Sequence, residues 1–421
     1  MRKQALAALW IAAGLYPAAS QAQTFTGFPP AVPPLTGAEQ VPADTGVSPP
    51  SVRITTTQLG QFVNSLNPSG NWLIAGDASQ NLWQRGTTGP VSSGTVLFGP
   101  DRWAYWSGSA ATPIQVSEDT TPIVTLPGFK AAYKMQRQAG STGTDMMCMA
   151  QEISSANSVP LQGQFVEMDF YVFGGANLSA TNVGIYIVAG TGTDEGVGAL
   201  AAGFSGGAGW TGQSRVVGAL FSPLFIGRVT QPAVVGLVPT TATELAVVLC
   251  MTPNGTAGTN DWMDFSGIQL RTAPVLASFA SKFTAYTAWS LPTPPFVWRL
   301  GVQEAALQEA YYWRINEGPG FDTVQGGCRS VAPSLLVSDC FIQFPVLMRQ
   351  APTMTYTVGF ETDADTGGDE NCTGLGTASW SSVVTNRGVT VSCTAAANVK
   401  AASFLYEHGG AGMIAADAEL H

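Results

Sequence analysis

The fold is decided by the stretch from Asn71 to Trp106, which contains NWLIAGDASQNLWQRG (Asn71–Gly86) and GPDRWAYW (Gly99–Trp106). This stretch holds several of the chain's tryptophans: Trp72, Trp83, Trp103 and Trp106. Between its halves lies TTGPVSSG (Thr87–Gly94), whose Gly, Pro and Ser residues are typical of a turn. Two apolar, aromatic segments divided by such a turn predict the first strands of a β-sandwich.

Later segments alternate apolar and polar residues with the period of two that marks a half-buried strand. Every second residue is apolar between Val166 and Val172, while Glu167 and Asp169 fall on the opposite face. The same alternation recurs in Val183–Ile187 and Leu245–Leu249, and the set of segments closes with Asp261–Leu270. Clusters of Gly, Asn and Ser separate these runs. We therefore expect an all-β sandwich domain over residues 70–275.

The C-terminal region, residues 317–421, is predicted to form a second β-sandwich. Strands are expected at Phe341–Leu347, Val389–Thr394 and Ala401–Tyr406. Prolines mark a junction, so residues 276–316 are interpreted as a linker and a helix. The apolar residues Val302, Ala306, Ala310 and Trp313 recur at helical spacing, which predicts one helix near 302–314.

The N-terminal segment, residues 1–22, is typical of a secretory signal. Arg2 and Lys3 precede an apolar run, and Ser20-Gln21-Ala22 provides the small residues of a cleavage site. The alternative is a retained segment that docks in a larger assembly. Residues 23–69 follow as a proline-rich arm, which we expect to run extended.

Several motifs resemble those of bacteriophage tail-fibre and appendage proteins. In the opening stretch the matching residues are Asn71, Gly76, Asp77, Trp83, Gln84, Arg85, Gly86, Asp101, Arg102 and Trp103. The arm resembles a short docking module of such proteins at Leu35, Gly37, Glu39, Val41 and Pro42, and the chain's end resembles their terminal sandwich at Ala415–Leu420. The resemblance implies a jelly-roll fold for the first sandwich, and a homotrimer. It also implies that the arm attaches to other virion proteins and that the sandwiches bind a host-surface glycan.

The charge of the chain excludes some partners. Asp, Glu, Lys and Arg make up 11% of the residues, against about 25% in a typical protein. The net charge is −10, from 18 basic and 28 acidic residues. Binding of nucleic acid or of an anionic membrane needs clustered Lys and Arg, so we expect neither partner.

Aromatic residues are the candidates for sugar binding. A flat ring stacks on the apolar face of a pyranose, and neighbouring polar side chains bind its hydroxyl groups. The candidates are Trp103, Tyr105, Trp106 and Trp210. The alternative is that these rings fill the sandwich core or a subunit interface.

No resident cofactor is expected apart from a structural Ca²⁺. The first and last strands of such sandwiches are neighbours, which would bring Trp72–Asp77 close to Asp264–Leu270. Carbohydrate-binding jelly-rolls often hold Ca²⁺ at that junction, where Asp77 and Asp264 would supply oxygen ligands. The alternative is a pair of solvated carboxylates.

Six cysteines allow fifteen pairings, and none forms a Cys-x-x-Cys motif. Their spacing suggests the disulfides Cys328–Cys340 and Cys372–Cys393, with Cys148–Cys250 bridging central strands. Disulfides fit a periplasmic or extracellular setting. Reduced, buried thiols are the alternative.

No catalytic constellation is recognisable, so we expect no enzyme. Gly203–Gly207 matches a nucleophile elbow, but the chain has only two histidines, His408 and His421. The leading interpretation is a virion structural protein, a fibre or appendage subunit that binds host glycans. The alternatives are a secreted or periplasmic bacterial carbohydrate-binding protein and a polysaccharide-degrading enzyme.

Overall fold

The computed structural model describes residues 40–43, 52–55, 70–121, 128–180, 182–221, 232–273, 286–287, 295–316, 323–330, 337–356, 360–363, 369–371, 384–394, 402–407 and 413–419. The chain separates into two units, Met1–Gly60 and Gln61–His421. In the first unit, β1 (Gln40–Ala43) pairs antiparallel with β2 (Val52–Thr55), so part of the arm forms a short ribbon. The predicted signal or docking segment, residues 1–22, lies outside the described residues.

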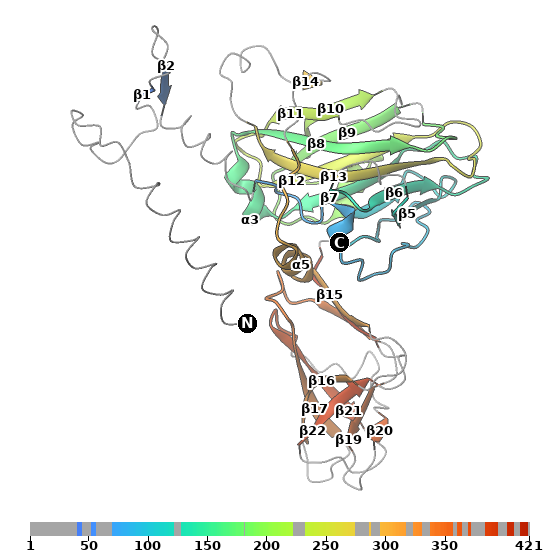
Figure 1. Cartoon of the computed structure of the whole chain (residues 1–421), viewed down its shortest axis with the longest axis vertical. Helices are drawn as coiled ribbons and strands as arrows, with labels where there is room; N and C mark the ends of the chain where they lie inside the picture. The colour runs from blue at the N-terminus through green and yellow to red at the C-terminus, as the bar shows by residue number, and fades with distance from the viewer. Residues whose placement is uncertain are drawn as a thin grey trace, which may run out of the picture. The chain divides into compact units, whose positions relative to one another are not determined.

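The second unit contains a sandwich of two six-stranded antiparallel sheets (Figure 1). The first sheet has the order β10 (Ser214–Phe221), β9 (Asn182–Gly190), β12 (Glu244–Thr252), β7 (Met147–Ile153), β4 (Ala104–Ser107) and β3 (Leu97–Phe98). The second has the order β14 (Tyr286–Thr287), β11 (Ala233–Leu237), β8 (Phe165–Gly174), β13 (Trp262–Thr272), β6 (Ala132–Arg137) and β5 (Ile114–Asp119). The predicted all-β sandwich is confirmed.

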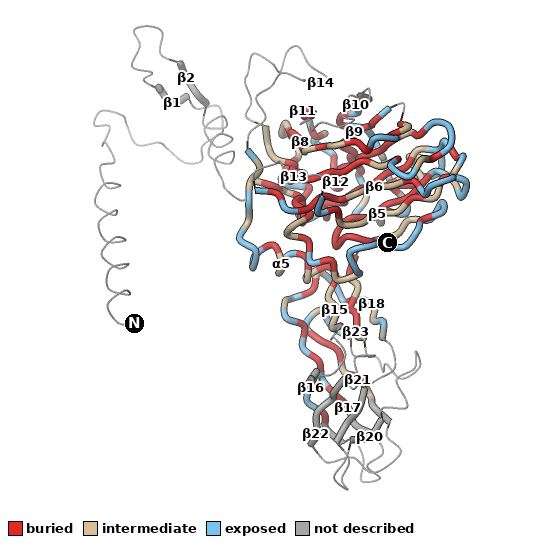
Figure 2. The backbone as a smooth tube through the Cα atoms, turned by 45° about the vertical axis from the view of Figure 1, so that its right-hand side comes forward, coloured by how far each residue is buried: buried red, intermediate tan, exposed pale blue. Residues whose placement is uncertain are grey.

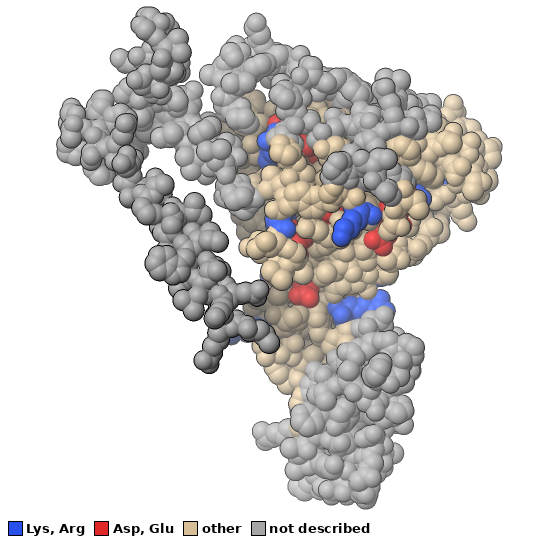
Figure 3. Space-filling view, in the orientation of Figure 1, with Lys and Arg blue, Asp and Glu red and all other residues tan. Residues whose placement is uncertain are grey.

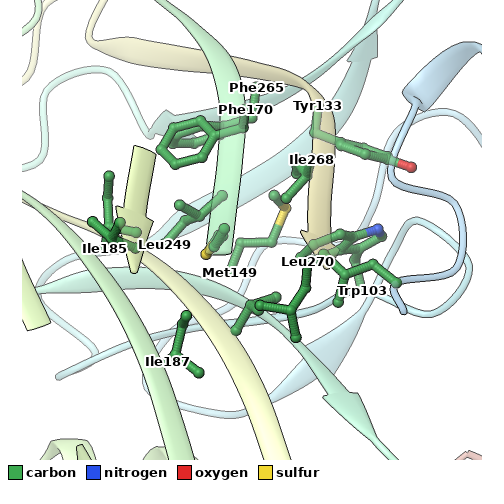
Figure 4. Close-up of a cluster of buried hydrophobic side chains, with 14 of the residues drawn as sticks. Trp103, Tyr133, Met149, Phe170, Ile185, Ile187, Leu249, Phe265, Ile268 and Leu270 are labelled. Atoms are coloured by element: carbon green, nitrogen blue, oxygen red, sulfur yellow. The ribbon is translucent and has the colours of Figure 1, made fainter. Parts of the chain in front are cut away.

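The main core lies between these two sheets. Figure 2 shows that most of the sandwich strands are buried and that loops at their ends are exposed. Large rings fill the centre, among them Trp103, Tyr133, Phe170 and Phe265 (Figure 4). Phe170 and Phe265 meet edge to face, with ring centroids 5.7 Å apart. The burial of apolar area at about 25 cal/mol per Å² makes this core the main source of the sandwich's stability.

Of the two strands predicted for the opening stretch, the second forms and the first does not. Only Leu97–Phe98 and Ala104–Ser107 are strands, while Asn71–Gly86 runs as bends and a short 3₁₀ helix, η2 (Ala78–Gln80). Asparagine and aspartate side chains accept hydrogen bonds from backbone N–H groups two residues further on. These pairs are Asn71 with Leu73, Asp77 with Ser79, and Asn81 with Trp83. Such local bonds compete with a strand ladder and turn the chain.

This stretch nevertheless closes the sandwich where the sequence predicted. The backbone N–H of Trp72 donates to Leu270 O at 2.8 Å, and that of Ile268 donates to Gly76 O at 2.7 Å. The indole N–H of Trp103 donates to Ala75 O at 2.8 Å. The predicted proximity of the first and last segments of the sandwich is therefore confirmed.

The outer face of the first sheet is covered. Helix α4 (Val197–Phe204) lies on it and buries Val197, Leu200 and Ala201 against β7, β9 and β12. The sequence prediction missed this helix because its segment is rich in glycine. Two shorter helical turns, α3 (Ser155–Ser158) and η3 (Val159–Leu161), connect β7 to β8. Among the described helices, none is long and apolar enough to span a membrane.

The C-terminal region forms the second predicted sandwich. One sheet has three strands: β15 (Tyr312–Asn316), β23 (Met413–Asp417) and β18 (Thr353–Tyr356). The other has the order β20 (Asp369–Asn371), β19 (Phe360–Asp363), β22 (Ala402–Glu407), β16 (Thr323–Ser330), β17 (Val337–Gln343) and β21 (Gly388–Thr394). Residues of both sheets share one core, including Ile342, Val391 and Ile414.

The predicted helix near 302–314 is shorter than expected. Helix α5 spans Gly301–Glu309, and β15 begins at Tyr312 because Tyr312–Asn316 pairs with β23. The helix buries its polar residues Glu304 and Gln308, whereas Val302 is 77% exposed. Glu304 accepts a hydrogen bond from Ala75 N, and Gln308 accepts one from Leu82 N at 2.8 Å. Polar contacts with the opening stretch thus decide which face of α5 is buried.

A junction of charged and aromatic residues joins the two sandwiches. The Arg102 guanidinium pairs with Glu419, donates to Glu152 O at 2.7 Å and lies 3.5 Å from the centre of the Tyr311 ring. Arg85 lies 3.5 Å from the centre of the Tyr312 ring and pairs with Asp417 at 3.1 Å. These contacts link the opening stretch to β15 and to the end of the chain.

Two of the predicted disulfides are present. Cys148–Cys250 joins β7 to β12, and Cys328–Cys340 joins β16 to β17. In the third predicted pair, Cys372–Cys393, Cys372 lies outside the described residues, so that pair stays a prediction. The alternative of reduced thiols is wrong for the two pairs that the structure describes.

Candidate functional site

The four aromatic residues predicted to stack on a sugar are buried, so that prediction was wrong. Trp103 and Tyr105 are 0% exposed, and Trp106 and Trp210 are 2% and 3% exposed. The first two face the sandwich core, and the other two pack between the first sheet and α4. A ring stacks on a ligand only if one face reaches solvent, and these rings fill the interior instead, as the alternative interpretation expected.

Asp77 and Asp264, the predicted Ca²⁺ ligands, make different contacts in the structure. Asp77 caps η2 by accepting a hydrogen bond from Ser79 N at 3.1 Å, and it lies 3.4 Å from the Ser266 hydroxyl oxygen. Asp264 accepts no hydrogen bond from the described residues. Within this part of the chain, no three His, Cys, Asp or Glu side chains are grouped to hold a metal ion. The two carboxyl groups therefore have separate environments.

The candidate site is the outer face of the second sheet, on the side away from the core. In β13, Met263, Phe265, Ile268 and Leu270 point into the core. Strand alternation therefore turns the residues between them outward: Trp262, Asp264, Ser266 and Gln269. In β8 the outward residues are Glu167, Asp169, Tyr171 and Phe173. We call the surface that these residues form with Lys134 of β6 the outer face.

An aromatic pair lies at one end of the outer face. The Trp262 and Phe173 rings stack, with centroids 5.9 Å apart and an interplanar angle of 30°. Both side chains are only partly buried. The Lys134 ammonium lies 4.7 Å from the centre of the Trp262 ring and pairs with Asp119 of β5. This end therefore combines a flat apolar ring with polar groups.

A buried ion pair fixes the position of Trp262. Arg137 ends β6 and donates from Nε to Asp261, the residue before Trp262, at 2.9 Å. Both charged side chains are 0% exposed. Gly175 N donates to Trp262 O at 2.9 Å, and a Cβ at Gly175 would lie 2.8 Å from the indole. Glycine is therefore required where the backbone passes beside the ring.

A second aromatic group lies further along the outer face. Phe129 contacts Tyr171, Phe296 and Trp298, with ring centroids 5.2, 5.4 and 5.0 Å away. Trp298 is 43% exposed. A bulge in β13 makes room for this group. At its centre Gly267 has φ +58°, and a Cβ there would lie 2.7 Å from the Phe129 ring.

Polar side chains continue along the same strands. The Gln269 amide donates to both carboxylate oxygens of Asp169 at 3.0 Å. Its carbonyl oxygen accepts a hydrogen bond from Val297 N at 3.1 Å. Arg271 pairs with Glu167 at 2.8 Å. Charges here are paired, and Figure 3 shows a surface with few charged residues.

Asp264 has a different environment from these paired groups. It is 0% exposed, and neither carboxyl oxygen has a hydrogen-bond partner among the described residues. Burial raises its pKa from the ordinary 3.8 to about 8, although the nearby Lys134 charge opposes the shift. At neutral pH the folded chain therefore holds Asp264 mainly as the uncharged acid.

The sequence contained a signal for this face that the aromatic candidates did not use. If Met263 and Phe265 are core residues, Trp262 and Asp264 must point the other way. Asp264 was selected, but as a cation ligand. Trp262, Phe173 and Trp298 are not among the predicted sugar-binding residues. Three of the four predicted residues lie in the opening stretch, whose aromatic side chains fill buried layers of the sandwich.

Comparison with known proteins gives matches of structure alone. No protein-family model and no curated protein matches the chain. Similar solved structures include the enzymatically active domain of tailspike protein 4 of bacteriophage CBA120, at 11% identity and a TM-score of 0.29, covering 49% of this chain and 22% of that one. They also include TmCBM61 in complex with β-1,4-galactotriose, at 10% identity and a TM-score of 0.28, covering 49% of this chain and 100% of that one. A CBM4 structure matches at 10% identity and a TM-score of 0.26, covering 41% of this chain and 88% of that one.

The protonation of Asp264 predicts how stability depends on pH. Between about pH 4 and pH 8 the folded chain holds a proton on Asp264 that the unfolded chain has lost, so this residue lowers the free energy of unfolding as pH rises. Asp264→Asn replaces the titrating carboxyl group by an amide that does not titrate. The free energy of unfolding of the variant, relative to that of the wild type, should rise by up to about 1.4 kcal/mol per pH unit across this window. Above the window the difference should stay constant. Urea unfolding at pH 5 to 9 measures the difference. A difference that does not change with pH would show that Asp264 is ionised in the folded chain.

Proposed function

We propose that this chain is a glycan-binding subunit of a virion appendage and that it binds its glycan on the outer face. The observation that carries the binding proposal is the partly exposed Trp262–Phe173 stack beside Lys134 and Asp264. An aromatic ring with hydrogen-bonding groups at its edge matches the two kinds of surface on a sugar ring.

The charge of the outer face supports a sugar over other ligands. Lys134 pairs with Asp119, and Arg271 pairs with Glu167, so these cations have carboxylate partners. A face with paired charges has little to attract a polyanion such as nucleic acid. Sugar hydroxyl groups, in contrast, bind amides, acids and ammonium groups without needing a net charge.

The virion part of the proposal is supported by α5 and by the motifs of the opening stretch. Val302 and Leu307 are 77% and 37% exposed, and Leu300 just before the helix is 67% exposed. An apolar helix face in contact with water is typical of a surface that another subunit covers. We infer that α5 lies at the axis of a homotrimer and that the N-terminal arm attaches the trimer to other virion proteins.

A secreted carbohydrate-binding protein is the second candidate. The disulfides Cys148–Cys250 and Cys328–Cys340 support an oxidising, extracellular setting, which a virion surface and a secreted protein share. The two candidates differ in oligomeric state, because a secreted binder has no need of the trimer. We propose binding without cleavage in either case.

Substitution of Trp262 tests glycan binding. Trp262→Ala should lower the affinity for any oligosaccharide that the wild type binds on a glycan array by about tenfold or more, as expected for a Trp at the centre of an interface. Phe341→Ala removes an aromatic that is 51% exposed on the C-terminal sandwich and should leave affinity unchanged. Unchanged binding by the Trp262 variant would exclude the outer face as the site. Chromatography of the incubated oligosaccharide should return it intact, and shorter products would identify an enzyme.

Substitution of Val302 tests the homotrimer. Light scattering of the full chain should give three times its mass of 43.8 kDa, and Val302→Asp should shift the population toward monomer, because it puts a charge into an apolar interface. Leu220→Asp, at a residue of β10 that is 64% exposed, is the matched control and should leave the trimer intact. A monomeric wild type would favour the secreted binder.

A further inference from the structure

The Asp264 carboxyl group has an unusual position in the fold. Both of its oxygens are buried, and neither accepts a hydrogen bond from the described residues. Buried polar groups are nearly always hydrogen-bonded, and a missing partner costs about 1–3 kcal/mol. A short acidic side chain on the outer face of a strand can avoid that cost by pointing into water. Asp264 is instead held at the base of a group of longer side chains.

The neighbours of Asp264 do not use its oxygens. Its direct partners on the adjacent strands are Lys134 in β6 and Phe173 in β8. The Lys134 ammonium is turned toward Asp119 and the Trp262 ring. Phe173 has no hydrogen-bonding group. The Asp264 carboxyl group, at the aromatic end of the outer face, therefore has no hydrogen-bond partner among these neighbours.

The hydroxyl of Ser266, two residues along β13, is also directed elsewhere. It donates to Ala131 O at 3.0 Å and lies 3.4 Å from Asp77. Ser266 is itself 0% exposed, so its hydroxyl cannot rotate toward Asp264 without breaking these contacts. A partner for Asp264 must come from outside the described fold.

We propose that Asp264 is the hydrogen-bonding residue at the floor of the saccharide site and that this site selects a neutral saccharide. In the bound state a sugar ring lies on Trp262, and one of its hydroxyl groups fills the unused capacity of the Asp264 carboxyl. This inference depends on the proposed function and adds the class of ligand and a residue that determines it.

The chemistry of the carboxyl group favours a hydroxyl as its partner. An uncharged carboxyl has one O–H donor and one carbonyl acceptor, and a sugar hydroxyl likewise donates and accepts. The two groups can therefore satisfy each other in a single contact. A carboxylate on the ligand can only accept, so it would leave the Asp264 carbonyl oxygen unsatisfied. It would also repel Asp264 once that residue ionises.

Access to Asp264 requires one side chain to move. Lys134 is the direct neighbour of Asp264 on β6. Its flexible four-carbon side chain is 20% exposed. Rotation of this chain, on the timescale of surface side-chain motion, lets a hydroxyl group approach the carboxyl. The Trp262–Phe173 stack stays in place, because Arg137 and Gly175 hold the backbone beside it.

The pH dependence of binding follows from the groups around Asp264. The nearest charged group on the neighbouring strands is Lys134 of β6, the direct partner of Asp264, which pairs with Asp119 of β5. The other titratable side chains of the strands beside it are Tyr133 and Arg137 on β6, Glu167, Asp169 and Tyr171 on β8, and Glu118 on β5. Asp264 itself loses its proton near pH 8. Loss of that proton removes the donor to the sugar hydroxyl, so affinity for a neutral saccharide should fall between pH 6 and pH 9.5.

Titration calorimetry of the full chain tests this inference. The probes are cellohexaose, maltohexaose, mannohexaose and trigalacturonic acid, at pH 6 and pH 9.5. The wild type should bind at least one neutral hexasaccharide about tenfold more weakly at pH 9.5. Asp264→Asn keeps a carbonyl acceptor and supplies N–H donors, so it should bind at pH 6 like the wild type and show no such pH dependence. Asp264→Ala should lose about tenfold at pH 6.

Controls separate this inference from the proposed function. Asp339→Asn changes a carboxylate of the C-terminal sandwich and should alter nothing. If Trp262→Ala abolishes binding while Asp264→Ala binds like the wild type, the role of Asp264 is wrong and the proposed function stands. Tighter binding of trigalacturonic acid than of every neutral probe overturns the ligand class. Failure of the wild type to bind any probe counts against both proposals, and unfolding curves of each variant confirm that it is folded.

Discussion

The buried ion pair between Arg102 and Glu419 is the interaction on which the arrangement of the second unit depends. It joins the opening stretch to the end of the chain, 317 residues away, with the guanidinium stacked on Tyr311 at 3.5 Å. Arg102 has a left-handed φ of 70°, which is uncommon for a residue with a side chain. Arg102 and Glu419 are 4% and 3% exposed, so removing either charge leaves the other buried without its main partner, although Arg85 lies 3.8 Å from Glu419.

This junction also explains how the outer face obtains part of its surface. The segment from Pro295 to Leu300 runs from the second sheet to α5, and Arg299 fastens it by donating to Leu73 O at 2.7 Å and pairing with Glu304 at 2.8 Å. The same segment places Trp298 against Phe129. Because α4 covers the first sheet, the second sheet is the one whose outward aromatic residues reach the surface.

Strands such as β8 and the Cys328–Cys340 disulfide could be predicted from sequence, because alternation and short cysteine spacing are local signals. The course of the opening stretch could not be predicted, because Asn71 and Asn81 turn the backbone through side-chain hydrogen bonds that compete with strand pairing. The candidate site was missed for a related reason. Exposure of a tryptophan depends on which layer covers it, and Trp210 lies under α4 while Trp262 does not. No local pattern contains that information.

A double-mutant cycle on Arg102 and Glu419 tests the role of the junction most directly. Urea unfolding of the full chain would be measured for the wild type, Arg102→Met, Glu419→Gln and the double variant. Glu419→Gln should lower the free energy of unfolding by about 3–5 kcal/mol, because it leaves the Arg102 charge buried without a carboxylate partner. Arg102→Met should cost less, because Arg85 still lies 3.8 Å from Glu419. The double variant should be no less stable than either single one. Additive losses from the two substitutions would contradict the account, since they would show that the two residues do not stabilise the fold as a pair.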